Sequence, residues 1–129
     1  MFHIILFNPE IPPNTGNIMR LAANTGTTLH LIKPLGFNLN DNTLKRAGLD
    51  YKKNANFFIY DSLELCLKSI KFNEIYAFTK FAKKNFSKVG FKQNDCLLFG
   101  SETSGLPDYV IKQIKDTNKL RIPMVARSR

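Results

Sequence analysis

The stretch Asn8-Pro9-Glu10-Ile11-Pro12-Pro13-Asn14-Thr15-Gly16-Asn17-Ile18-Met19-Arg20 joins two elements near the start of the chain. The apolar run 3–7 before it predicts a buried strand, and the prolines prevent that strand from continuing. Asn14 or Thr15 is then a suitable cap for a helix predicted over 15–25. A strand followed at once by a helix is the expected beginning of an α/β domain.

The predicted helix carries an unusual polar face. Asn17, Arg20 and Asn24 fall at positions i, i+3 and i+7 and therefore share that face. A separate apolar stripe is predicted for Ile18, Leu21 and Ala22. A solvated face in a lysine-rich chain usually carries Lys and Glu, so amides with one arginine indicate a recognition surface. The alternative is an ordinary capped helix.

Length and composition restrict the class of protein. A chain of 129 residues with 43% hydrophobic residues is sufficient for one globular domain. No apolar stretch approaches the ~20 residues of a membrane span, and no signal-peptide pattern precedes the first strand. Cys66 and Cys96 lack the spacing and neighbouring His of a zinc site, so we expect both in the core. These features favour a cytoplasmic protein without a metal.

The net charge of +9 favours a polyanionic partner, because phosphate contacts require Lys and Arg. The basic residues are clustered at 45–53, at 80–92 and at 119–129. The alternative for any single cluster is a solvated lysine-rich face.

The remaining sequence alternates between strand-like and helix-like segments. Strands are predicted at 28–33, 57–60, 74–79, 95–99 and 120–123, helices at 62–71 and 107–116, and a basic helical turn at 42–47. This alternation predicts an α/β fold with a mostly parallel sheet covered on both faces.

Ligands of such sheets bind at the carboxyl ends of the strands, where Gly100-Ser101-Glu102-Thr103-Ser104-Gly105 is the most informative segment. Its glycine spacing resembles a phosphate-binding loop, but Leu106 and Pro107 replace the required Lys and Ser or Thr. Two interpretations remain. One is a glycine turn that approaches a ligand, with Glu102 as an acceptor; the other is a strand-to-helix turn with Pro107 at the first helical position.

Several segments together are similar to the motifs of one family. Residues 12–20 look like its first motif, 98–107 like its second, and 121–124 like the start of its third. Residues 46–51 are similar to a stretch typical of one subfamily. Over its whole length the chain resembles the SPOUT RNA methyltransferases, specifically the small tRNA 2′-O-methyltransferases that modify the wobble nucleotide.

The resemblance implies a SPOUT-type fold whose C-terminal part is threaded as a trefoil knot, an exception to unknotted topology. It also implies S-adenosylmethionine as the cofactor, the anticodon region of tRNA as the substrate, and a homodimer that completes the RNA site. We expect a single domain, 1–129, that lacks the family's final loop and helix.

The resemblance also implies roles for individual residues. Arg20 and Asn14 are expected to be catalytic, and the expected cofactor-binding residues are Phe78, Thr79, Gly100, Glu102, Ile122 and Met124. The expected RNA-binding residues are Asn17, Arg46, Lys83 and Lys84. A guanidinium can hold a phosphate and stabilise an oxyanion that develops on a ribose hydroxyl. His3 and His30 fall within strand patterns and are expected at core or edge positions.

Two other functions remain open at this point. A non-catalytic basic RNA-binding module of the same fold, as a truncated or inactive form, explains the charge equally well. Asn14, Arg20 and Glu102 argue against it, because backbone binding alone does not require them. A nucleotide-binding fold without an RNA partner is disfavoured by the positive charge.

Overall fold

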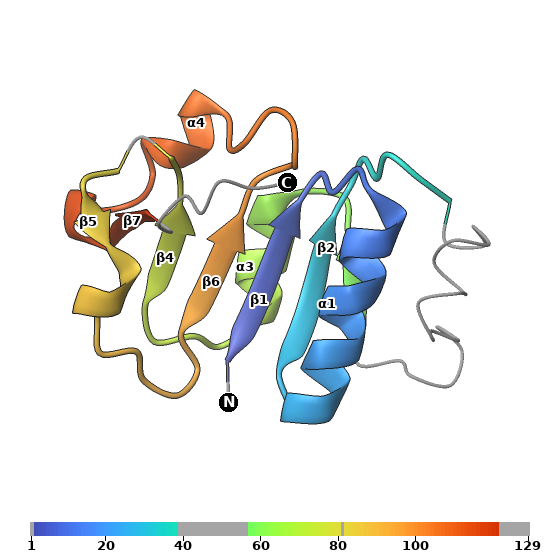
Figure 1. Ribbon diagram of the computed structural model, residues 1–129, viewed down its shortest axis with the longest axis horizontal. Helices are drawn as coiled ribbons and strands as arrows, with labels where there is room; N and C mark the ends of the chain where they lie inside the picture. The colour runs from blue at the N-terminus through green and yellow to red at the C-terminus, as the bar shows by residue number, and fades with distance from the viewer. Residues whose placement is uncertain (1, 39–56, 81, 122–129) are drawn as a thin grey trace.

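Strands and helices alternate along the chain in the structure, a computed structural model that describes residues 2–38, 57–80 and 82–121 (Figure 1). In chain order the elements are β1 His3–Phe7, α1 Pro12–Thr25, β2 Thr28–Ile32, β3 Phe57–Tyr60, α3 Leu63–Ser69, β4 Ile75–Phe78, β5 Lys84–Asn85, the 3₁₀ turn η1 Phe86–Lys88, β6 Cys96–Phe99, α4 Asp108–Ile111, the 3₁₀ turn η2 Asp116–Asn118 and β7 Lys119–Arg121. The helical turn predicted at 42–47 lies outside the described residues.

The described strands form one seven-stranded sheet in the order β3-β2-β1-β6-β4-β7-β5, and every neighbouring pair is parallel. The predicted α/β class with a parallel sheet is therefore confirmed. Because all strands run the same way, their carboxyl ends meet at one edge. There, Leu6 of β1 and Phe78 of β4 both pair with Phe99 of β6.

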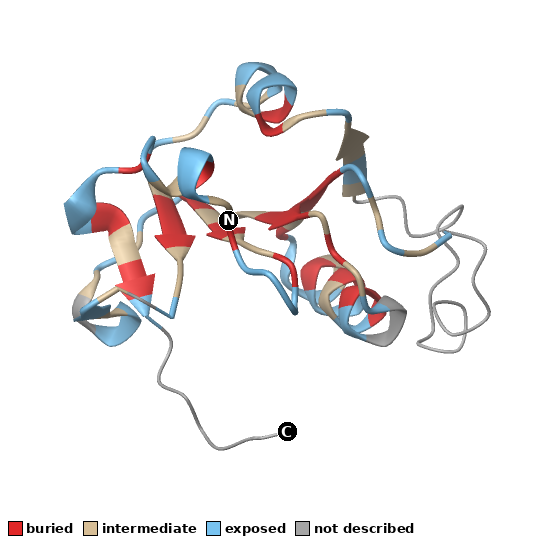
Figure 2. Ribbon diagram, turned by 90° about the horizontal axis from the view of Figure 1, so that it is seen from above, coloured by how far each residue is buried: buried red, intermediate tan, exposed pale blue. Residues whose placement is uncertain are grey.

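Helices lie on both faces of the sheet, as the view from above shows (Figure 2), and alternate residues of the strands pack against the two layers. On one face, Met19 and Ala22 of α1 pack with Leu6, Leu29 and Leu31. On the other face, the cluster includes Cys66 of α3 and Val110 of α4 together with buried residues of the central strands Ile5, Ala77 and Leu98. Each fully buried Leu or Ile side chain contributes roughly 1.5–3 kcal/mol.

Helix α1 begins earlier than predicted. Its cap is Ile11, whose side chain makes no capping hydrogen bond, and the two prolines occupy the first helical positions. Proline is favourable there because its φ is already helical and its missing N–H has no partner in the first turn. The prediction that Asn14 or Thr15 caps the helix is therefore wrong, since both lie inside it.

The two faces of α1 are only partly as predicted. Asn17, Arg20 and Asn24 are all exposed and confirm the shared polar face. Of the predicted apolar stripe, Ala22 is buried, whereas Leu21 is 58% exposed and does not pack in the core. The exposed Leu21 side chain instead borders a groove described below.

The C-terminal third differs from the prediction in two places. Helix α4 is much shorter than 107–116, because the amides of Gln113 and Ile114 bond three residues back and tighten the chain into turns. Pro107 is the N-cap of α4 rather than its first helical residue. The lysine-rich segment contains the short strand β5, which pairs with β7.

The cysteines and histidines occupy structural positions. Cys66 and Cys96 are fully buried, which raises the pKa of each thiol to about 12 and confirms them as core residues. His30 is also buried; its Nε2 lies 3.0 Å from His3 Nδ1 and its Nδ1 3.0 Å from the Tyr60 hydroxyl. None of the described helices has the length and apolar character needed to cross a membrane. Within the same ranges, no group of three or more His, Cys, Asp and Glu is placed to hold a metal.

Candidate active site

The candidate site lies at the carboxyl edge of the sheet, where β1, β4 and β6 end beside one another. The rings of Phe78 and Phe99 stack there with centroids 4.6 Å apart and an interplanar angle of 6°. Residues 100–107, which follow β6, and residues 8–11, which follow β1, meet next to this aromatic pair.

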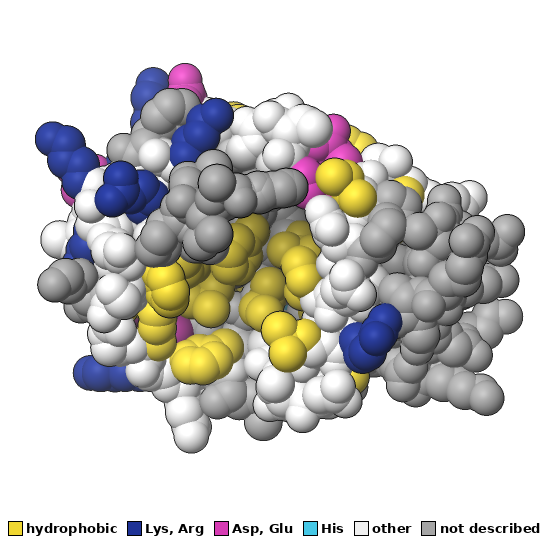
Figure 3. All heavy atoms as spheres, viewed as in Figure 1, with side chains coloured by type: hydrophobic (Ala, Val, Ile, Leu, Met, Phe, Trp, Pro, Cys, Tyr) yellow, Lys and Arg dark blue, Asp and Glu magenta, His cyan; other side chains and the backbone are white. Residues whose placement is uncertain are grey.

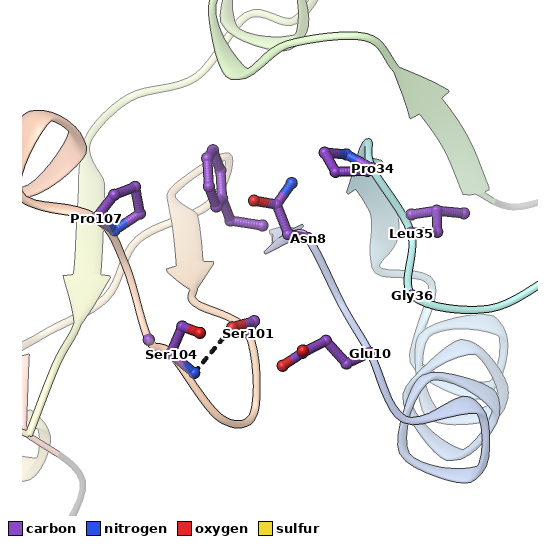
Figure 4. Close-up of a pocket in the computed structure, with 10 residues that line it drawn as sticks. Asn8, Glu10, Pro34, Leu35, Gly36, Ser101, Ser104 and Pro107 are labelled. Carbon is purple, nitrogen blue, oxygen red and sulfur yellow. Dashed lines mark hydrogen bonds between the residues drawn. The ribbon is translucent and has the colours of Figure 1, made fainter.

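The loop after β6 folds back on itself as a tight turn. The Gly105 amide donates to the Ser101 carbonyl at 3.0 Å, and the Ser104 amide donates to Ser101 Oγ at 3.1 Å (Figure 4). A Cβ atom at Gly100 would lie 2.2 Å from the carbonyl carbon of Gly105, and Gly105 has a φ of 68°. The turn therefore requires glycine at both ends, at Gly100 for close approach and at Gly105 for the left-handed backbone.

A pocket of about 390 Å³, here called the β4 pocket, lies between this loop and the end of β4. Its lining residues are Phe78, Thr79, Lys80, Phe99, Gly100, Ser101, Glu102, Thr103, Ser104, Gly105 and Leu106. The pocket brings together the predicted cofactor residues Phe78, Thr79, Gly100 and Glu102. The other two, Ile122 and Met124, lie outside the described residues. Stacked aromatic rings beside exposed loop backbone can hold a flat ring and hydrogen-bond its edge.

A second pocket of about 520 Å³, here called the α1 groove, lies between α1 and the ends of β1 and β6. Its lining residues are Ile4, Leu6, Pro9, Asn14, Thr15, Asn17, Ile18, Leu21, Phe99, Gly100 and Glu102. On this face of the molecule, hydrophobic side chains gather in a hollow beside α1 (Figure 3). Within the groove, Thr15 Oγ1 is buried and has no hydrogen-bond partner among the described residues.

The α1 groove and the β4 pocket share part of their walls. Gly100 and Glu102 line both, so the predicted residues Asn14 and Asn17 of α1 lie around the same groove as two predicted cofactor residues. Arg20 is exposed on α1 one turn beyond Asn17. The structure thus brings residues of the first and second motifs to adjoining cavities.

Glu102 and Glu10 join the two loops at this edge. The two carboxylate oxygens of Glu102 accept hydrogen bonds from the backbone amides of Glu10 at 2.8 Å and Ile11 at 3.1 Å. In return, Glu10 Oε1 accepts from the Thr103 amide at 3.2 Å and the Thr103 hydroxyl at 2.5 Å. These bonds from Thr103 lower the pKa of the Glu10 carboxyl. Glu102 had been expected to accept a hydrogen bond from the cofactor, whereas here both of its oxygens bind protein backbone.

A third cavity of about 340 Å³ lies on the far side of the β6 loop, between Asn8, Pro34 and Pro107 (Figure 4). Asn8 adopts a left-handed φ of 52°, and its side-chain amide donates to the Ile32 carbonyl at 3.2 Å. Asparagine tolerates this conformation better than most residues. The sequence did not predict this cavity.

The predicted RNA-binding residues are separated in the fold. Asn17 is exposed on α1, whereas Lys83 and Lys84 are exposed near the opposite end of the sheet, around β5. Arg46 lies outside the described residues. The functional candidates that sequence reasoning missed are Glu10 and Thr103. The one sequence feature that indicated Glu10 is its position between prolines just before a predicted helix.

The fold is that of the SpoU methyltransferases. A structure solved in a study of the 2-OH methylation of C/U34 on tRNA matches with a TM-score of 0.87 and 40% identity, covering 98% of this chain and 82% of that one. The SpoU methyltransferase AviRb from Streptomyces viridochromogenes, solved in complex with AdoMet, shares the fold with a TM-score of 0.78 at 18% identity, covering 98% of this chain and 51% of that one.

The chain belongs to the SpoU rRNA Methylase family, whose family model matches residues 1–129. A tRNA (cytidine(34)-2'-O)-methyltransferase from Methylovorus glucosotrophus is 46% identical over all of this chain and 84% of that protein. Another, from Yersinia pestis, is 48% identical over all of this chain and 83% of that protein. The resemblance proposed from the motifs is therefore confirmed.

Proposed function

We propose that this chain transfers a methyl group from S-adenosylmethionine to the ribose 2′-hydroxyl of the wobble nucleotide of tRNA. Relatives with this activity in their names are 46–48% identical over the full chain. The observation that carries the proposal is structural: Gly100 and Glu102 line both the β4 pocket and the α1 groove. A cofactor in one and a nucleotide in the other would therefore be neighbours.

The β4 pocket fits the cofactor. Its glycine turn places Gly100 and Gly105, which have no side chains, in the wall of the cavity, and the stacked Phe78 and Phe99 rings offer an aromatic surface. Phe78, Thr79, Gly100 and Glu102 would hold the cofactor from this side, together with Ile122 and Met124. When bound, S-adenosylmethionine supplies a methyl group that its sulfonium already activates.

The methyl acceptor requires more assistance from the protein than the donor does, because a ribose hydroxyl is a poor nucleophile at neutral pH. Arg20 would fix a phosphate of the RNA and stabilise the negative charge that develops on the attacking oxygen as the hydroxyl proton passes to solvent. Asn14 would orient the ribose in the α1 groove. Holding the acceptor in line with the donor supplies much of the rate enhancement.

We also propose how the protein contacts tRNA and how two copies complete the RNA site. Asn17, Arg46, Lys83 and Lys84 would contact the anticodon region, and the net charge of +9 favours any such contact. Asn17 lies on α1, which packs on β2, whereas Lys83 directly precedes the edge strand β5. An RNA site completed across a homodimer would explain this separation. A C-terminal trefoil knot and a cytoplasmic location also belong to this proposal, as does a single domain spanning 1–129.

Calorimetric titrations with S-adenosylmethionine and with tRNA test this function against a purely RNA-binding role. We expect saturable binding of both ligands by the same protein. Binding of tRNA without any binding of S-adenosylmethionine would contradict the enzyme and favour the RNA-binding module.

A further inference from the structure

The loop after β1 and the loop after β6 are joined by hydrogen bonds in which each loop supplies one carboxylate acceptor. Glu10 and Glu102 are 92 residues apart in the sequence. Glu102 reaches the amides of Glu10 and Ile11, and Glu10 reaches the amide and hydroxyl of Thr103. We call Glu10, Glu102 and Thr103 the carboxylate clamp. Figure 4 shows the Glu10 carboxylate directed toward the turn that contains Ser101 and Ser104.

One half of the carboxylate clamp fixes the beginning of α1. The cap residue Ile11 has no side-chain capping bond, and Pro12 and Pro13 have no N–H to donate. The Glu102 carboxylate supplies what the helix lacks, because it accepts the Ile11 amide at the positive end of the helix dipole. The N-terminus of α1 is therefore anchored to the loop after β6 and not capped from within.

The other half fixes the loop after β6. Glu10 is itself held in place, because the Gly36 amide donates to the Pro9 carbonyl at 2.9 Å. A Cβ atom at Gly36 would lie 3.0 Å from Glu10 Cα, so the segment after β2 packs directly on it. From this fixed position Glu10 binds Thr103, three residues beyond Gly100 in the wall of the β4 pocket.

We infer that Glu10 is a positioning residue for methyl transfer. Through the carboxylate clamp it sets the distance between α1, which carries Asn14 and Arg20, and the loop that lines the β4 pocket. This inference rests on the proposed function, in which donor and acceptor approach from these two elements. A misplacement of about 1 Å between reacting groups can lower a rate by about a hundredfold, so a small relaxation of the clamp affects turnover before it affects binding.

The test compares Glu10→Ala with Glu10→Gln, because glutamine keeps an acceptor oxygen for Thr103. For Glu10→Ala we expect kcat to fall at least roughly tenfold, with KM for S-adenosylmethionine and for tRNA within about threefold of the wild type. Glu10→Gln should recover most of the lost kcat. Thr103→Val, which removes the hydroxyl donor but keeps the amide, should fall between them. Glu64→Ala is the matched control, an exposed carboxylate on α3.

A merely stabilising role would lower the unfolding temperature of Glu10→Ala and leave kcat of the folded fraction unchanged, and that result would overturn the inference. Equal losses in Glu10→Gln and Glu10→Ala would also overturn it. If Glu10→Ala does not fold, Thr103→Val decides: a wild-type kcat overturns the inference and a reduced one at constant KM supports it. A wild type that transfers no methyl group would overturn the proposed function as well as the role of Glu10. If the wild type and Glu10→Ala are equally active, only the role of Glu10 is overturned.

Discussion

Arg20 stands on the exposed face of α1, so its side chain is available to a bound nucleotide without contributing to the core. We predict that Arg20→Ala lowers the rate of methyl transfer roughly a hundredfold or more, as loss of an oxyanion-stabilising donor does. The unfolding temperature should not change. Single-turnover rates and thermal unfolding measure the two effects, and Lys68→Ala provides a control at an exposed cation of α3. Retained turnover in Arg20→Ala would remove the arginine from the reaction.

The candidate-site residues that could be predicted from the sequence are those that come after the ends of neighbouring strands. Asn14 and Gly100 come shortly after β1 and β6, which are neighbours in a parallel sheet, so the topology alone brings them together. Glu10 could not be predicted in the same way. Its partner Thr103 is 93 residues away, and a hydrogen bond at that separation depends on loop conformations that no local pattern specifies.

At the scale of the element, the turn after β6 depends on Gly100. The sequence predicted a glycine turn that approaches a ligand, and the structure adds a constraint within the turn itself: even a single Cβ at Gly100 would overlap the carbonyl carbon of Gly105 at 2.2 Å. We predict that Gly100→Ala opens the turn and weakens S-adenosylmethionine binding at least roughly tenfold, a loss of about 1.4 kcal/mol.

Gly90 offers a matched control for that substitution, because a Cβ there has nothing within 4 Å. Gly90→Ala should bind the cofactor with wild-type affinity in the same calorimetric titration. Unchanged affinity in Gly100→Ala would show that the β4 pocket is not the cofactor site.

Elements with strong local patterns were the most predictable. The strands at 3–7 and 57–60 agree with β1 and β3 residue for residue, because short apolar runs between turn residues have few alternatives. Strand β5 was missed because Lys84 and Asn85 have no strand-like pattern; their pairing with β7 is a tertiary effect. Helix α4 was predicted too long because its apolar spacing continues through Ile114, which is buried but follows a tightened turn.

For the molecule as a whole, the hydrogen-bonded chain of His3, His30 and Tyr60, in which His30 is buried, makes stability depend on pH. Burial, together with the neighbouring His3, lowers the pKa of His30 from 6.5 to about 4. Between these values the unfolded chain binds a proton that the folded chain does not. The free energy of unfolding should therefore fall as the pH decreases from about 6.5 toward about 4.

Denaturant unfolding at several pH values in this window measures that slope. His30→Gln should have a shallower slope than the wild type, whatever its absolute stability, because the titrating group has been removed. The pKa of the His3 imidazole is also lowered by burial, so part of the slope should remain. Identical slopes for both proteins would contradict the assignment to His30.

The charge of the whole molecule predicts a salt-dependent association with tRNA. We predict that Lys83→Glu combined with Lys84→Glu weakens tRNA binding and reduces the slope of log K against log salt by about one to two. Lys68→Glu combined with Lys112→Glu gives the same change in net charge at two exposed lysines on α3 and at the end of α4. Equal effects in the two double variants would mean that the lysines act through net charge and not through a local RNA contact.

The most direct measurement is nucleoside mass spectrometry of tRNA incubated with the protein and S-adenosylmethionine that carries a deuterated methyl group. The proposed methyl transfer predicts label on the ribose of nucleotide 34, the position named for the relatives, and none in a matched tRNA with a 2′-deoxy sugar there. Label on a base, label in the deoxy tRNA, or no label in either tRNA would contradict ribose methylation at this position.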